Sequence, residues 1–430
     1  MRSGAPHRVP RSRWKWVAGA AAVGALLSSG CGGTSAAEDA GDRPARAEPT
    51  TSSPTDPGGP SRAFDGSTEE FYAPPDPLGP GSPGELLRYQ DLGAGDGQRT
   101  YRVMYRSTDR TGADRAVTGI VTVPEDAAPD RGWPVVSYGH SSAGVSTSCA
   151  PSRQGLPAPA WGVSGVAAAT DYIGLGPVGE THPYLSRQAE GNAMIDIVIA
   201  AAGLPGADTS GQWVAVGHSQ GGHAALAARE LAGTRAPELD LAAAVAVAPG
   251  VLTDRSWGPT DRALMDLLTI LQLHGAAAGD EAIELSDYVT GGVMDATAVL
   301  DTGCVDEIVN SMAPVFGSSP FVEDPWETEP ARSALEDNEV GSVIVPEVPL
   351  MIVSGGADTT VLPERVDALV ELLCADPGFI GREDFPDADH GSVVVLATGT
   401  IAGFLDSALE GSTADGTQVD DSRLAEDCGS

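Results

Sequence analysis

The stretch QWVAVGHSQGG, Gln212–Gly222, joins a predicted strand to a predicted helix. Trp213–Val216 is a short apolar run typical of a buried strand, and the HAALAARELAG that follows Gly222 has helical composition. Between them Ser219 has a glycine two residues away on either side. This is the G-x-S-x-G pattern of a nucleophile elbow, in which a tight turn presents the serine between strand and helix. Because the chain has 54 glycines in 430 residues, the pattern needs support from the rest of the sequence.

Predicted strands and helices alternate on both sides of this stretch. Alternation after an antiparallel start predicts an α/β protein with a mostly parallel, doubly wound sheet. The antiparallel pair is Tyr101–Ser107 with Val117–Pro124, and the later elements are strands at Trp133–His140, Gly165–Tyr172, Leu241–Pro249 and Val348–Gly356 and a helix at Ala189–Leu204.

Residues 250–346 interrupt the alternation. They contain short helical patterns, and Leu264, Leu267, Leu268 and Leu271 lie on one side of one of them. We expect a helical cap inserted above the carboxyl edge of the sheet, with these leucines in its own core. The predicted organisation is therefore an α/β core at 84–249 and 347–410, a cap at 250–346 and a C-terminal tail at 411–430.

The N-terminus has the features of an export signal. A basic stretch, Arg8 to Lys15, precedes the apolar run Val17–Leu27, and small residues lead to Cys31. The end of this stretch, LLSSGC, resembles a bacterial lipoprotein signal, which implies a signal peptide at 1–30 and a lipid anchor on Cys31 at the cell surface. Plain cleavage and secretion is the alternative. Residues 31–83 are rich in Pro, Gly, Ser and Thr and predict a disordered tether. Three aromatic residues near the end of this tether could dock on the folded domain: Phe64, Phe71 and Tyr72.

Charge and cysteine content narrow the functional classes. The chain has 60 acidic and 25 basic residues, a net charge of −35, so we expect it to repel nucleic acid and anionic membranes. Without Cys31 four cysteines remain, an even number that suggests two disulfides in an oxidising compartment, with three possible pairings. Their spacings fit no compact metal site, and no metal or cofactor is expected. The four are Cys149, Cys304, Cys374 and Cys428.

The order of residues along the chain selects a base and an acid for Ser219. In an elbow-type hydrolase the acid and then the histidine follow the serine. Of seven histidines only His390 follows the Val348–Gly356 strand, and Asp358 comes directly after that strand. The carboxyl ends of parallel strands share one edge of a sheet, so Asp358 should lie near Ser219. The competing acids are Asp387 and Asp389.

Backbone N–H groups should stabilise the negative charge that develops on the substrate oxygen. One belongs to Gln220, the residue after the nucleophile, and the other to the loop within His140–Gly144. In that loop we favour Ser142, followed by Ala143.

With these residues in view, the chain resembles the secretory lipase family of α/β-hydrolases, which includes the fungal lipase-A type and actinobacterial exported relatives. The resemblance covers roughly Tyr101 to Leu409 and rests on four motifs, SYGHSSAGVSTSCAPS, ATDYIGLGPVGETHPYL, GHSQGGHAAL and GGADTTVLP. It implies Ser219, Asp358 and His390 as the catalytic triad, and a helical cap. It implies a disulfide between Cys149 and Cys304, which leaves Cys374 with Cys428. Relatives commonly have HGTTG where this chain has His140-Ser-Ser-Ala-Gly144. We expect Tyr172 and His182–Tyr184 to support the site without taking part in the chemistry.

The sequence thus predicts an exported serine hydrolase that cleaves carboxylic esters through an acyl-enzyme. By resemblance, its substrates are fatty-acid esters, triacylglycerols included. Small-ester, acyl-transfer or peptidase activity on the same triad is one alternative. A non-catalytic surface binding protein with the same fold is another.

Overall fold

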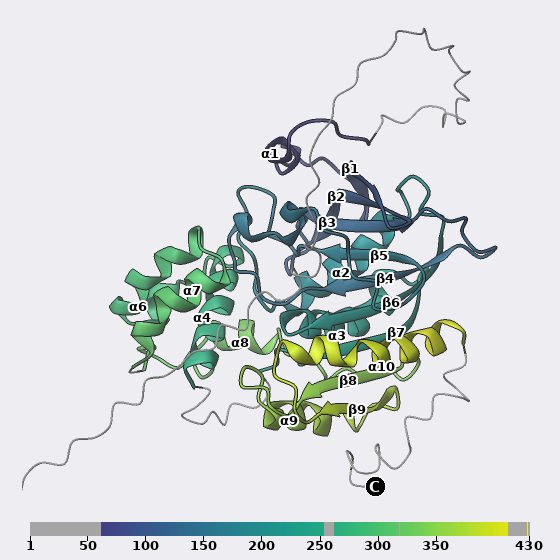
Figure 1. The fold of residues 1–430 in the computed structure, drawn as a ribbon. Coiled ribbons are helices and arrows are strands. Elements are labelled where there is room, and N and C mark those ends of the chain that lie inside the picture. The colour runs from purple at the N-terminus through teal and green to yellow at the C-terminus, as the bar shows by residue number, and fades with distance from the viewer. Residues whose placement is uncertain (1–61, 253–261, 318, 412–427, 429–430) are drawn as a thin grey trace, which may run out of the picture. The chain divides into compact units, whose positions relative to one another are not determined.

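One mixed sheet runs through the described part of the computed structural model, which comprises residues 62–252, 262–317, 319–411 and 428 (Figure 1). Its nine strands lie in the order β1-β2-β3-β5-β4-β6-β7-β8-β9. They are β1 (Leu86–Gly95), β2 (Gln98–Thr108), β3 (Asp114–Pro124), β4 (Trp133–Gly139), β5 (Val166–Thr170), β6 (Thr209–His218), β7 (Asp240–Val247), β8 (Leu350–Gly355) and β9 (Phe379–Phe385).

Antiparallel pairing is confined to the first part of the sheet. The strands β1, β2, β3 and β5 pair antiparallel, whereas β5, β4, β6, β7, β8 and β9 pair parallel. Parallel strands need crossover connections, and helices supply several of them. The helices that pack on the sheet are α2 (Arg187–Ala201), α3 (Gln220–Arg235), α9 (Pro363–Leu373) and α10 (Ser392–Leu409). The predicted antiparallel start and mostly parallel sheet are both confirmed.

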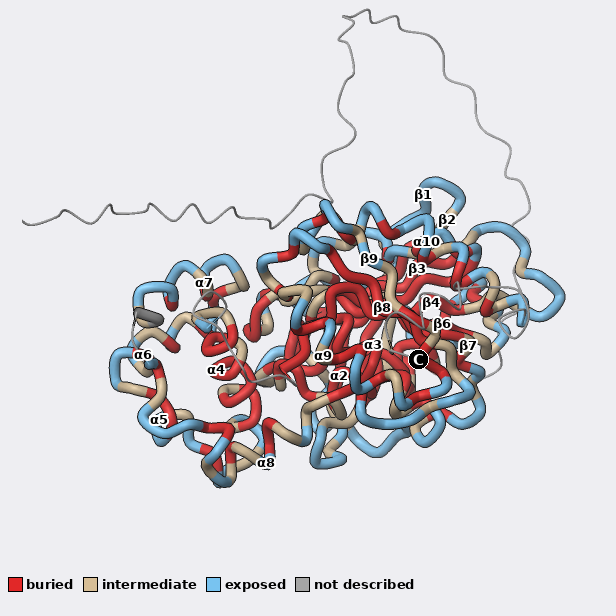
Figure 2. The backbone as a smooth tube through the Cα atoms, turned by 90° about the horizontal axis from the view of Figure 1, so that it is seen from below, coloured by how far each residue is buried: buried red, intermediate tan, exposed pale blue. Residues whose placement is uncertain are grey.

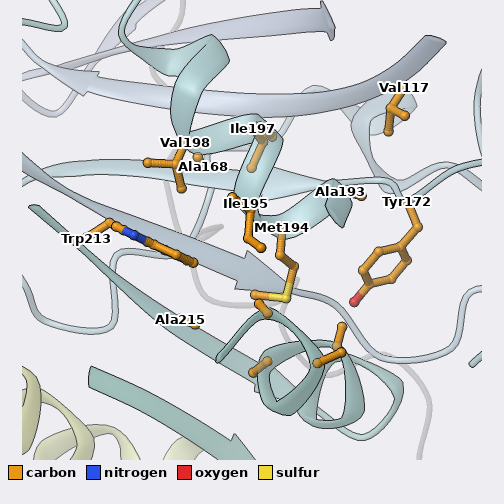
Figure 3. Close-up of a cluster of buried hydrophobic side chains, with 14 of the residues drawn as sticks. Val117, Ala168, Tyr172, Ala193, Met194, Ile195, Ile197, Val198, Trp213 and Ala215 are labelled. Atoms are coloured by element: carbon orange, nitrogen blue, oxygen red, sulfur yellow. The ribbon is translucent and has the colours of Figure 1, made fainter. Parts of the chain in front are cut away.

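Alternate residues of β6 face two different hydrophobic cores. Trp213 and Ala215 pack in a cluster with α2, α3 and α9, while Val214 and Val216 pack on the other face with α10. Figure 3 shows Trp213 and Ala215 near Met194 of α2, and Figure 2 shows the buried strands at the centre. The period of two residues in a strand produces this division. Helix α10 has a mean hydropathy of 1.6, enough by length and composition for a membrane span, yet its buried side chains pack on β6, β7 and β8.

The segment between β7 and β8 is helical and has a third cluster of buried residues. Within this inserted segment, defined as residues 262–336, Met265 and Leu271 of the longest helix pack with Ile308 and Trp326. Its helices are α4 (Arg262–Gly279), α5 (Leu285–Tyr288), α6 (Gly291–Ala296), η3 (Thr297–Asp301), α7 (Val305–Met312), η4 (Ala313–Gly317) and α8 (Ala331–Glu336), seen beside the sheet in Figure 1.

The folded region begins earlier than the sequence indicated. The tether expected at 31–83 extends too far, because a short helix, α1 (Thr68–Phe71), precedes β1 and both Phe71 and Tyr72 are fully buried. A few large aromatic side chains bury enough apolar surface to outweigh a composition that otherwise favours disorder. Cys31 and the predicted signal at 1–30 lie outside the described residues.

Candidate active site

Ser219 occupies the turn between β6 and α3 in a strained backbone conformation. Its φ is 58° and its ψ is −117°, a region that residues with a side chain seldom adopt. The turn is held by main-chain hydrogen bonds. Ser219 N–H donates to the Val247 carbonyl at 2.9 Å, and its own carbonyl accepts from Gly222 and Gly250, each at 2.9 Å. The geometry is that expected of a nucleophile elbow.

The glycines on either side of Ser219 are required by close backbone contacts. A Cβ on Gly217 would lie 1.8 Å from the Gly221 carbonyl oxygen, and a Cβ on Gly221 would lie 1.8 Å from the carbonyl oxygen of Gly139 in β4. Both separations are far below van der Waals contact. The glycine spacing of the sequence motif therefore follows from the way the chain folds back on itself here.

Asp358 and His390 meet at the same edge of the sheet, one after β8 and the other after β9. The His390 Nδ1 lies 2.7 Å from Asp358 Oδ2. The other carboxylate oxygen, Oδ1, accepts from the N–H groups of Thr360 at 2.7 Å and Val361 at 2.9 Å. Asp358 is 3% exposed. Asp389, a competing acid, instead accepts from Ser392 N–H at 2.8 Å at the start of α10.

His218, the residue before Ser219, joins the elbow to His390. Its ring centroid is 4.6 Å from that of His390, and its Nε2 donates to the His390 carbonyl at 2.8 Å. Burial, together with the neighbouring His390, lowers the pKa of His218 to about 4. His218 is therefore neutral near pH 7, with its single proton on Nε2, and it fixes the main chain that carries His390.

The two residues expected to supply oxyanion donors lie at the ends of β4 and β6. Gln220 is the first residue of α3, where a backbone N–H has no partner within the helix. Ser142 lies in the loop after β4, and its hydroxyl is 2.7 Å from the hydroxyl of Tyr184. The assignment of the donors stays a prediction.

A buried polar network beneath the elbow was not anticipated from the sequence. Its centre is Glu190 of α2, which is fully buried. One carboxylate oxygen accepts from Gln220 Nε2 at 2.7 Å and Leu185 N–H at 2.8 Å, and the other lies 3.0 Å from His223 Nδ1. His223 Nε2 donates to the Asn338 carbonyl at 2.8 Å. The available signal was a glutamate beside the small and apolar residues of a helix that also contains Asn192 and Asp196, because a buried charge needs partners.

Two disulfides join distant parts of the chain, in the pairs that the resemblance implies. Cys149 bonds Cys304, linking the loop after β4 to the inserted segment, and Cys374 bonds Cys428. Within the described ranges, no group of three or more His, Cys, Asp and Glu side chains could hold a metal ion.

Residues 164–413 match the family described as secretory lipase. The chain belongs to the secretory lipase family. The chain is 26% identical over 347 residues to a probable inactive lipase of Mycobacterium tuberculosis (strain CDC 1551 / Oshkosh), a match that covers 72% of this chain and 74% of the relative.

Its fold is similar to that of two solved hydrolases. Lipase A of Candida antarctica in its closed state has a TM-score of 0.63 and 18% identity, over 83% of this chain and 92% of that one. The rice cell wall degrading esterase LipA of Xanthomonas oryzae has a TM-score of 0.59 and 17% identity, over 77% and 100%. At such low identity the likeness shows the fold alone. The predicted α/β-hydrolase fold is confirmed.

Family and fold together support a carboxylic-ester hydrolase of the lipase/esterase type. The secretory family and the two disulfides also suggest an extracellular protein.

Proposed function

We propose that this member of the secretory lipase family hydrolyses carboxylic esters through an acyl-enzyme on Ser219. The observation that carries the proposal is the 2.7 Å contact between His390 Nδ1 and Asp358 Oδ2. A carboxylate only accepts, so the proton is on Nδ1 and the lone pair is on Nε2. That is the tautomer a general base needs.

The reaction proceeds in two steps, formation of the acyl-enzyme and its hydrolysis. The Ser219 oxygen bonds to the ester carbonyl carbon while His390 Nε2 takes the hydroxyl proton, and Asp358 stabilises the imidazolium. The tetrahedral oxyanion accepts from the N–H groups of Gln220 and Ser142, then collapses with cleavage of the ester C–O bond as His390 protonates the departing alcohol. Water attacks the acyl-enzyme in the same manner, which releases the acid and restores Ser219.

The substrate class is an ester of a fatty acid, consistent with the family. A small ester, acyl transfer to another alcohol, and peptide cleavage use the same triad. A series of p-nitrophenyl esters from acetate to palmitate, run beside peptide substrates, separates these activities. Turnover that rises with acyl length supports the lipase assignment, and cleavage of peptides without ester turnover contradicts it.

The nucleophile is tested by covalent labelling. We expect a fluorophosphonate probe to label the full chain at one site and to leave Ser219→Ala unlabelled. Similarity to a relative named a probable inactive lipase makes a non-catalytic binding protein the second candidate. A folded wild type that takes up no probe would favour that candidate and rule out the acyl-enzyme.

We also propose export with a lipid anchor on Cys31, the alternative being secretion without lipid. The basic, apolar and small-residue order before Cys31 supports the proposal. The mass of the mature N-terminal peptide tests it. A lipid-modified cysteine is expected there, and an unmodified N-terminus overturns the anchor.

A further inference from the structure

The loop after β5, residues 171–185, bonds to both residues that are assigned oxyanion donors. His182 Nε2 is 2.7 Å from Gln220 Nε2, and the Tyr184 hydroxyl is 2.7 Å from the Ser142 hydroxyl. We propose that His182 and Tyr184 are positioning residues that hold the main chain of Gln220 and Ser142 for stabilisation of the oxyanion. This inference rests on the proposed function and assigns a role to two residues outside the triad.

The His182 contact has only one arrangement of protons. Burial lowers the pKa of His182 to about 4, so the ring is neutral near pH 7. Its Nδ1 donates to the Ile173 carbonyl at 2.7 Å, which leaves Nε2 as an acceptor. Gln220 donates one amide hydrogen to this nitrogen and the other to Glu190. A flipped amide would turn its oxygen toward a carboxylate and a lone pair, so the Gln220 side chain has a single orientation.

The Tyr184 contact holds the other side of the proposed oxyanion site. Tyr184 is buried, and burial raises the pKa of its hydroxyl, which therefore keeps its proton. The neighbouring main chain is fixed from the inserted segment, since Val305 N–H donates to the Ala143 carbonyl at 2.9 Å. Residues 142–143 are thus held by a side chain on one side and by a backbone hydrogen bond on the other.

The loop itself is tied to the core near both ends. The Tyr172 hydroxyl donates to the His140 carbonyl at 2.9 Å, and Leu185 N–H donates to Glu190. One anchored segment therefore sets the positions of Gln220 and Ser142 relative to each other. Preorganised donors act where charge develops, so an error in their position should appear in kcat rather than in KM.

A double-mutant cycle tests the Tyr184 contact. Tyr184→Phe and Ser142→Ala each remove one partner of the same bond, and each should lower kcat for p-nitrophenyl butyrate about tenfold with KM within about twofold. The double variant should be no slower than the slower single variant, because one bond is lost in all three. Tyr101→Phe is the matched control. It removes the hydroxyl of a buried tyrosine that donates to the Pro205 carbonyl at 3.3 Å, outside the loop 171–185, and should leave kcat unchanged.

Two substitutions of His182 test the other contact. A glutamine at position 182 places a polar atom near the position of the histidine Nε2, whereas an asparagine reaches only the position of Nδ1. His182→Gln should therefore keep kcat within about threefold, and His182→Asn should lower kcat tenfold or more. Complete fluorophosphonate labelling of each variant establishes that it is folded with a working nucleophile.

The outcomes separate the two proposals. If labelled Tyr184→Phe matches wild type in kcat, or its effect adds to that of Ser142→Ala, the positioning role is wrong while the triad stands. If His182→Asn does not fold, the Tyr184 cycle alone decides. A wild type that takes up no probe overturns the hydrolase and the positioning role together.

Discussion

Ser219 is held in a backbone conformation that costs free energy. Hydrogen bonds on both its N–H and its carbonyl offset the cost of its φ of 58°. The flanking glycines permit the approach of three backbone segments within van der Waals range. The conformation of this turn depends on individual atoms, so single substitutions at Ser219 and its neighbours test it.

Gly221→Ala should abolish the elbow. The added Cβ would meet the Gly139 carbonyl oxygen at 1.8 Å, so we expect a loss of more than about 3 kcal/mol in the free energy of unfolding and no fluorophosphonate labelling. Gly233→Ala on the same helix is the control, because a Cβ there meets nothing within 4 Å. It should stabilise α3 by up to about 1 kcal/mol. A labelled, stable Gly221→Ala protein would contradict the steric argument.

Asp358→Asn should lower kcat by about 10⁴-fold with little change in stability, because an amide can donate to Nδ1 and favours the wrong tautomer of His390. Steady-state kinetics with a short nitrophenyl ester measures this. Asp389→Asn, at the exposed start of α10, should keep kcat within about threefold and change stability little, because asparagine caps a helix about as well as aspartate. Equal losses in both variants would mean that Asp358 is not the orienting acid.

At the scale of elements, the loop after β4 is joined directly to the inserted segment. Ala143 accepts from Val305, Gly144 forms a bridge with Cys304, and Cys149 forms a disulfide with Cys304. The inserted segment therefore contacts the proposed oxyanion loop directly. Loss of this connection should affect catalysis as well as stability.

The two disulfides should differ in their effect on activity. Replacing Cys149 and Cys304 by alanine should cost about 2–5 kcal/mol and lower kcat, since the loop with Ser142 loses its covalent tie. Replacing Cys374 and Cys428 should lower stability alone, because this disulfide joins the residue after α9 to Cys428 and makes no covalent tie to the loop with Ser142. Chemical denaturation and steady-state kinetics on both pairs check this. An unchanged kcat in the first pair contradicts the link between the disulfide and the oxyanion loop.

Strands and triad candidates were predictable from the sequence because their signals are local or depend on chain order. Trp213–Val216 shows a short apolar run, and His390 is the single histidine after the acid-bearing strand. The contacts of Glu190 were not predictable. Gln220 and His223 are 30 and 33 residues away along the chain, and no periodic pattern connects them. The start of the folded region was misplaced because two buried aromatics lie within a Pro- and Gly-rich stretch.

For the molecule as a whole, buried histidines make stability depend on pH. The pKa values of His182 and His218 are lowered by burial from 6.5 to about 4. Between these values the unfolded chain binds a proton at each site and the folded chain does not, so stability falls as pH falls from 6.5 to 4. Each histidine contributes about 3 kcal/mol of this loss at pH 4.

His218→Gln isolates one of these contributions. The difference in unfolding free energy between wild type and variant should fall by about 3 kcal/mol from pH 7 to pH 4 and should stay constant above pH 7. Urea denaturation at each pH measures it, and the range above pH 7 is the internal control. A constant difference down to pH 4 would mean that His218 is charged in the folded protein.

The strand that presents Ser219, β6, contributes side chains to two hydrophobic cores. Trp213 and Ala215 belong to one core, and Val214 and Val216 belong to the other. Neither core can unfold while both faces of β6 stay packed. The elbow follows β6 directly, and the carbonyl that accepts from Ser219 N–H belongs to Val247 of the second core. Heating should therefore produce no long-lived species with a loosened sheet and a competent nucleophile, and thermal inactivation should follow the same cooperative transition as loss of the sheet.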